Sequence, residues 1–151
     1  MSTLSKTLQD AVVARLLTFE ALAGVPVLGR RKGNITNDID AALMTLGACL
    51  YVQPALSVEV NPNLPGPYVD RLQVRIRAIE LPSINSTLPD AYELAEIVLT
   101  HLHEANFSGI TGLEGINPLT CLSRPIEEVA DPEALFFDIT FVTSVGLTPV
   151  N

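Results

Sequence analysis

Apolar residues near the start of the chain recur at helical spacing. From Thr3 to about Leu22 they fall three or four positions apart, which places them along one side of a helix that Ser2 or Thr3 could cap. The positions in this stripe are Leu4, Leu8, Ala11, Val12, Arg15 or Leu16, and Phe19. Ala23-Gly24 then ends the predicted helix. Residues 25–28 follow as a short strand at a sheet edge, because Pro26 lacks a backbone donor.

The next elements alternate between helix and strand. A second helix is predicted with Asn37 as its cap and Gly47 at its end, and with Asp38 and Asp40 near the positive end of the helix dipole. Its apolar positions are Ile39, Leu43, Met44 and Leu46. Two short runs of strand composition follow at 48–52 and 56–60, with Pro54 between them.

The most regular alternation in the chain runs from Val69 to Leu81. Apolar Leu72, Val74, Ile76 and Ala78 alternate with polar Arg71, Gln73, Arg75 and Arg77. Because side chains in a strand point to opposite faces in turn, this pattern predicts a strand with one buried face and one polar face.

The last third of the chain predicts a helix and two strands. The helix begins at Pro89 and runs to about Glu104, and the strands cover 119–126 and 135–145, joined by an acidic hairpin region at 127–133. The order of elements predicts an α+β single domain spanning residues 1–151. We expect four to six strands in a mostly antiparallel or mixed sheet, with two or three helices on one face.

Composition excludes several classes of protein. Apolar residues make up 48% of the chain and charged residues 17%, which excludes an intrinsically disordered chain. No apolar run approaches the ~20 residues of a membrane span, and no signal peptide opens the sequence, so we expect a soluble, intracellular protein. Cys49 and Cys121 lie far apart in apolar segments and are interpreted as small buried hydrophobic residues.

The charge balance points away from nucleic acid. Seventeen acidic residues outnumber nine basic ones, and the net charge of -8 opposes binding by neutralisation of phosphates. The chain has no tryptophan and only 5% aromatic residues, so stacking platforms for bases are scarce. A lightly charged, apolar-rich chain instead suggests association with other protein chains.

The sequence contains no motif typical of an active site. There is no G-x-S-x-G, and His101 and His103 are two positions apart, which separates them by about 200° around a helix and prevents joint metal binding there. Acidic pairs lie in a first helical turn or a hairpin region, where acids are common. We therefore predict no catalytic residue, no metal, no cofactor and no enzyme activity. A small-molecule enzyme or ligand-binding domain built from scattered residues is the alternative from a different class.

Positive charge is concentrated in two places. Six of the nine basic residues form two clusters, Arg30, Arg31 and Lys32 in a glycine-bounded loop, and Arg71, Arg75 and Arg77 on one face of the predicted strand. The strand arginines could form a solvated face paired with acids of the same chain. Alternatively, their planar guanidinium groups could pair with carboxylates of another chain. The sequence is compatible with both interpretations, and contact with DNA is the minor alternative.

The order of these segments resembles the tail terminator, or tail completion, proteins of tailed bacteriophages. The resemblance covers nearly the whole chain and rests on short segments rather than on a signature motif. These segments are the opening helix with Gly24-Val25-Pro26-Val27, the region from Gly33 to Asp40 leading to Leu43-x-x-Leu46-Gly47, Arg75 to Glu80, Ala91 to His103, Asn117-Pro118-Leu119, Arg124-Pro125-Ile126, and Phe137 to Val145.

The resemblance implies a structural virion protein without catalysis. It implies a homohexameric ring at the head-proximal end of the tail, which ends polymerisation of the tail tube and offers a joining surface to neck or connector proteins. The expected partners are further copies of the chain, the tube protein and a neck protein, with assembly in the host cytoplasm, no membrane, and DNA only passing through the lumen. The extended loop 61–67, with Asn63 and Leu64, or the long strand pair that flanks it, would reach a neighbouring subunit or the tube. Another head-tail connector or neck subunit is the nearest alternative.

Overall fold

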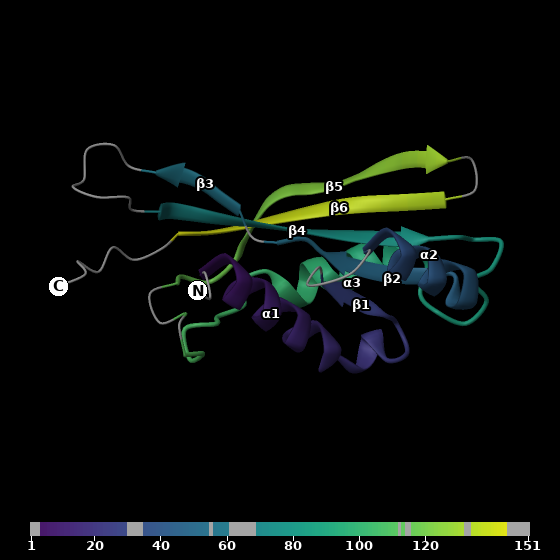
Figure 1. Cartoon of the computed structure of the whole chain (residues 1–151), viewed down its shortest axis with the longest axis horizontal. Helices are drawn as coiled ribbons and strands as arrows, with labels where there is room; N and C mark the ends of the chain where they lie inside the picture. Colours follow the sequence, from purple (N-terminus) through teal and green to yellow (C-terminus); the bar gives the residue numbers. More distant parts are fainter. Residues whose placement is uncertain are drawn as a thin grey trace.

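The computed structural model describes residues 4–29, 35–54, 56–60, 69–111, 113, 116–131 and 134–144, with the backbone alone for 4, 56–60, 69–71, 122–131 and 144. Its elements in chain order are α1 (Leu4–Leu17), a short 3-10 helix η1 (Glu20–Leu22), β1 (Val27–Gly29), α2 (Ile35–Leu46), β2 (Ala48–Val52), β3 (Leu56–Val60), β4 (Val69–Glu80), α3 (Ala91–Leu102), β5 (Thr120–Asp131) and β6 (Ala134–Ser144). The predicted α+β fold is confirmed, and Figure 1 shows its long strands running side by side along the molecule.

The strands form one mixed sheet of six strands in the order β1-β2-β4-β6-β5, with β3 also paired to β4. Only β1 and β2 are parallel; the other pairs are antiparallel. Both β2 and β3 lie along the same edge of β4, because Val52 pairs with Ile76 and Leu56 pairs with Gln73. Pro54 interrupts this edge, and β1 takes the outer position that the sequence predicts.

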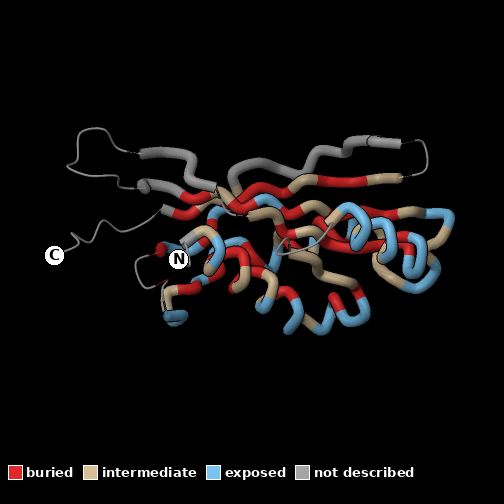
Figure 2. The backbone as a smooth tube through the Cα atoms, in the orientation of Figure 1, coloured by how far each residue is buried: buried red, intermediate tan, exposed pale blue. Residues whose placement is uncertain are grey.

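The face of the sheet that carries Leu50, Ala78 and Phe137 holds the main core. These three residues are in register across β2, β4 and β6, and all are buried. Helices α1 and α3 pack on this face, and Figure 2 shows the buried positions along the sides of the helices that meet the sheet. The helix residues in this core include Leu8, Val12 and Leu16 of α1 and Leu94, Val98 and Leu102 of α3.

Helix α2 lies on the opposite face. Its Leu43 packs with Cys49, Ile79 and Phe136, which alternate along their strands with the residues of the main core and therefore point the other way. Two helices share a face as predicted, whereas the sequence order did not reveal that the third crosses to the other side. In the described residues α2 covers one end of that face, the end where Ile79 and Phe136 pair.

Several boundaries differ from the prediction, among them the end of α1, which stops at Leu17 instead of about Leu22 and is followed by the separate 3-10 helix η1. Asn37 lies inside α2 rather than before it, because the helix begins at Ile35. Pro89 precedes the cap of α3 instead of opening the helix: the Asp90 carboxylate accepts a hydrogen bond from the Glu93 backbone N–H at 2.8 Å. Most of the acidic stretch 127–133 belongs to β5, which extends to Asp131.

The connection between β4 and α3 is pinned by a buried carboxylate. Glu80 is 6% exposed, and its Oε1 accepts from the Ala91 backbone N–H at 3.1 Å while its Oε2 accepts from Asn85 Nδ2 at 2.8 Å. Gly47 ends α2 with φ +85°, and a Cβ there would collide with the Asn85 backbone. These contacts fix the start of α3 against the end of β4.

Candidate interaction surfaces

The strand register places Arg75 and Arg77 on the face of the sheet opposite the main core, as predicted. Arg75 pairs with Thr140 of β6, and Arg77 pairs with Tyr51 of β2 and Asp138 of β6. The backbone of Arg71 pairs with Ser144. Arg75 and Arg77 share a face with α2, but α2 covers only one end of it, so the two side chains have different surroundings.

Arg77 is satisfied within its own chain. Its Nε and Nη2 donate to the two carboxylate oxygens of Asp138 at 2.8 and 3.0 Å, and its guanidinium carbon lies 4.5 Å from the centre of the Phe136 ring. The side chains of Arg77 and Asp138 are 33% and 23% exposed. For this residue the intramolecular interpretation of the arginine row holds.

Arg75 has the opposite character. It is exposed, and no ion pair involving it is found in the part of the chain that the structure describes. Its neighbours in the register are the buried Thr140 and, across the β2 edge, the backbone N–H of Gln53, which donates to the Arg75 carbonyl at 2.9 Å. Of the two arginines in this row whose side chains the structure describes, Arg77 is half-buried and paired, whereas Arg75 is exposed.

The other residues predicted to lie at an interface are Arg30, Arg31, Lys32, Asn63 and Leu64, and they fall outside the described residues. The side chain of Arg71 does as well. The element order nevertheless places both segments. The basic cluster lies between β1 and α2, and the 61–67 loop lies between β3 and β4.

Neither cysteine forms a disulfide, and the Cys49 thiol is unreactive because it stays protonated. Burial raises the pKa of the Cys49 thiol to about 12, so the residue stays a neutral thiol near neutral pH. It packs under α2, as its interpretation as a buried hydrophobic residue predicts. Cys121 is half-buried and packs against the main core.

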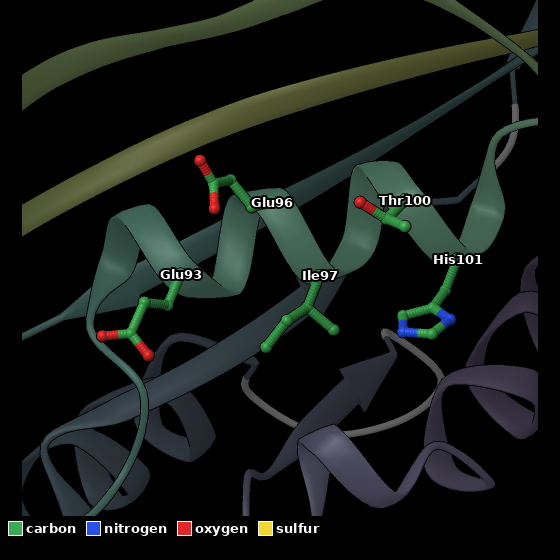
Figure 3. Close-up of a pocket in the computed structure, with 5 residues that line it drawn as sticks. All are labelled: Glu93, Glu96, Ile97, Thr100 and His101. Atoms are coloured by element: carbon green, nitrogen blue, oxygen red, sulfur yellow. The ribbon is translucent and has the colours of Figure 1, made fainter.

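A surface hollow of about 310 Å³ runs along the outer side of α3 (Figure 3). Glu93, Ile97 and His101 follow one side of the helix there, and Glu96 and Thr100 complete the lining. The His101 ring stacks on Phe19 with 4.4 Å between centroids. The lining holds no serine or cysteine, and among the described residues no group of three or more His, Cys, Asp and Glu could hold a metal ion.

The two histidines are exposed, as predicted, but each has a contact. While His101 stacks on Phe19, the Nδ1 atom of His103 accepts a hydrogen bond from the Cys121 backbone N–H at 3.3 Å. His103 therefore joins the end of α3 to the start of β5. These contacts explain both side chains structurally.

The sequence pattern places Arg15 or Leu16 in the helical stripe and predicts no further role for Arg15. In the structure its guanidinium lies close to two phenylalanine rings, and its Nε is buried without a hydrogen-bond partner among the described residues. The i, i+4 spacing of Arg15 and Phe19 was visible in the sequence, but the second ring, Phe107, comes from a distant segment and could not be foreseen.

Comparison with known proteins gives a structural likeness. No protein-family model and no curated protein sequence matches the chain. A chain in a solved structure described as the virion of a native gene transfer agent (GTA) particle superposes with a TM-score of 0.58 at 18% identity, over 91% of this chain and 93% of that chain. No helix among the described residues is long and apolar enough to cross a membrane. The chain thus has the fold of a component of a gene transfer agent virion along nearly its whole length.

Proposed function

We propose that this chain is a structural virion protein of a phage-like particle, and specifically a tail terminator. The observation that carries the proposal is the likeness to a chain of the gene transfer agent virion, which covers 91% of this chain and 93% of the other. The likeness therefore extends over nearly the whole fold of both chains, rather than over a shared substructure.

The finer assignment rests on the resemblance to tail terminator proteins and on the surface. A terminator acts as a closed ring that stops a growing tube, so each copy must offer two different, complementary surfaces to its neighbours. Large apolar side chains are exposed in several places, among them Leu17 at 62%, Met44 at 68% and Tyr92 at 52%. Exposed apolar groups of this size suit contacts between chains. Arg75 adds an open guanidinium on the sheet face.

The charge of the chain agrees with a passage for DNA. A net charge of -8 per chain multiplies with the number of copies in a ring. Like charges around a lumen keep a polyanion from adhering while it moves through. The protein would then lie on the path of the genome without gripping it.

The nearest alternative function is that of another neck or connector subunit, because the likeness to a virion chain supports that role as well as the terminator role. The two roles differ in what they do to the tube. A small-molecule enzyme or binding domain would need convergent polar groups in a concave site, whereas the α3 hollow presents two carboxylates and a stacked histidine on an open helix surface.

A tube-capping assay tests the terminator role. Purified tube protein is allowed to polymerise with and without this chain, and tube lengths are measured by negative-stain electron microscopy. A terminator shortens the tubes in proportion to its concentration and is seen at one tube end. Unchanged lengths together with binding to a connector protein would assign the chain to the neck instead.

A further inference from the structure

Arg15 occupies an unusual environment at the end of α1. It lies in the last turn of the helix and is half-buried, with its guanidinium carbon 5.8 Å from the centre of the Phe19 ring and 5.7 Å from that of Phe107. Its Nε is buried and has no hydrogen-bond partner among the described residues. A buried donor that gives up water without gaining an acceptor costs free energy and calls for an explanation.

Comparison with Arg77 shows which partner is not found around Arg15. It too lies against an aromatic ring, Phe136 at 4.5 Å, but its Nε and Nη2 donate to the carboxylate of Asp138. Arg15 has the aromatic support and, in the described part of the chain, no acidic partner. Within the described residues, the chain thus contains one complete arginine-carboxylate site and one arginine with no acidic partner.

A purely structural role explains Arg15 only in part. A cation in the last turn of a helix interacts favourably with the helix dipole, and an aliphatic stem covers apolar surface. A lysine would serve both purposes. The planar guanidinium, held near two rings, is suited to planar recognition of a carboxylate, because its donors keep a fixed geometry.

We propose that Arg15 is a carboxylate-binding site that accepts an acidic side chain from a neighbouring copy of this chain. The inference rests on the proposed ring, in which each copy presents one surface to the copy before it and another to the copy after it. The charge balance supports this source: seventeen acidic residues face nine basic ones, and Asp38, Asp40, Glu93 and Glu96 are exposed. Because its Nε is buried, a carboxylate from a neighbouring copy would reach the Nη atoms of Arg15 end on, rather than the Nε and Nη2 that Asp138 binds on Arg77.

The site is tested by comparing how well the wild type and three variants assemble. Sedimentation velocity over a dilution series compares the wild type with Arg15→Gln, Arg15→Lys and, as a matched control, Lys6→Gln, which removes one positive charge from an exposed position of the same helix. Arg15→Gln should raise the concentration for half-assembly at least tenfold. Arg15→Lys should raise it too, because charge without the planar donor set is insufficient, and Lys6→Gln should change it less than twofold.

The outcomes separate this inference from the ring itself. If the wild type forms rings and both Arg15 variants assemble as well as it does, the ring stands and the carboxylate site is wrong. Circular dichroism confirms that the variants fold; Arg15→Lys keeps the stem that covers Phe107, so it remains informative if Arg15→Gln unfolds.

A wild-type chain that stays monomeric would overturn the proposed function, and the site is then tested with a small probe. Glutarate is titrated into ¹⁵N-arginine-labelled protein, with chloride at equal ionic strength as control, and the Nε–H resonances are followed. A saturable shift of the Arg15 resonance alone, with Arg77 unchanged, supports carboxylate binding. A shift shared by all arginines, or none, contradicts it.

Discussion

Arg77 and Asp138 form a two-point ion pair across β4 and β6, in which the arginine Nε and Nη2 donate to separate carboxylate oxygens at 2.8 and 3.0 Å. The pair divides the arginine row into members with different roles. Arg77 joins two strands of the sheet, while Arg75, two positions away on the same face, is exposed. The row is therefore not a uniform binding surface.

Replacement of Arg77 should lower stability. Arg77→Gln removes both charge-assisted hydrogen bonds and leaves Asp138 without its partner, and because the pair is partly solvated we expect a loss of roughly 1–2 kcal/mol. Arg75→Gln is the control and should stay within about 0.5 kcal/mol of the wild type. Urea unfolding followed by circular dichroism measures both. Equal stability of the two variants would show that the ion pair contributes nothing.

Arg75 is the better probe of assembly. Arg75→Glu reverses the charge at an exposed position, so rings should weaken while the free energy of unfolding of the subunit changes little. Arg77→Glu would instead set a carboxylate against Asp138 and destabilise the fold, so a double reversal cannot separate assembly from folding. Sedimentation velocity at two salt concentrations provides the measurement. Wild-type ring formation by Arg75→Glu would mean that the whole row is a solvated face.

Gly47 should not tolerate a side chain. Gly47→Ala adds a Cβ against the Asn85 backbone at a residue with φ +85°, and both effects act together to cost at least about 2 kcal/mol. Gly109→Ala is the matched control, because nothing lies within 4 Å of a Cβ built there. Thermal unfolding compares the two. Similar melting temperatures would contradict the close approach of the α2 end to the 81–90 connection.

Periodicity predicted the elements well because the buried faces are regular. Leu72, Val74, Ile76 and Ala78 are all buried in β4, and the stripe of α3 is buried from Ala91 to Leu102. Periodicity does not say which face of a sheet a helix covers. The position of α2 depends on Cys49, Ile79 and Phe136, three residues from three separate strands, and only the register brings them together.

The candidate surfaces were less predictable for the same reason. The alternation of β4 placed the arginines on one face, but Asp138 lies 61 positions beyond Arg77, so a sequence pattern could not reveal the pair. Phe107 and Arg15 likewise meet only through the packing of α1 against the segment after α3. Local spacing identifies faces, whereas partners depend on contacts between distant segments.

Duplex DNA should bind poorly at physiological salt. The net charge of -8 repels phosphates, and only nine basic residues are available per chain, of which Arg77 is already paired. Fluorescence anisotropy with a labelled duplex should show no saturable binding at micromolar protein. Micromolar affinity that disappears when Arg30, Arg31 and Lys32 become alanine would make that cluster a DNA-contacting element.

The mass of the purified protein in solution tests the central claim, that the chain is a ring-forming virion subunit, most directly. Mass photometry or sedimentation velocity at tens of micromolar, with negative-stain images of the same sample, should show one closed species several times the 16.2 kDa of the chain, with a central opening and a sixfold outline. A 16.2 kDa monomer alone, with no rings in the images, would contradict self-assembly into a ring.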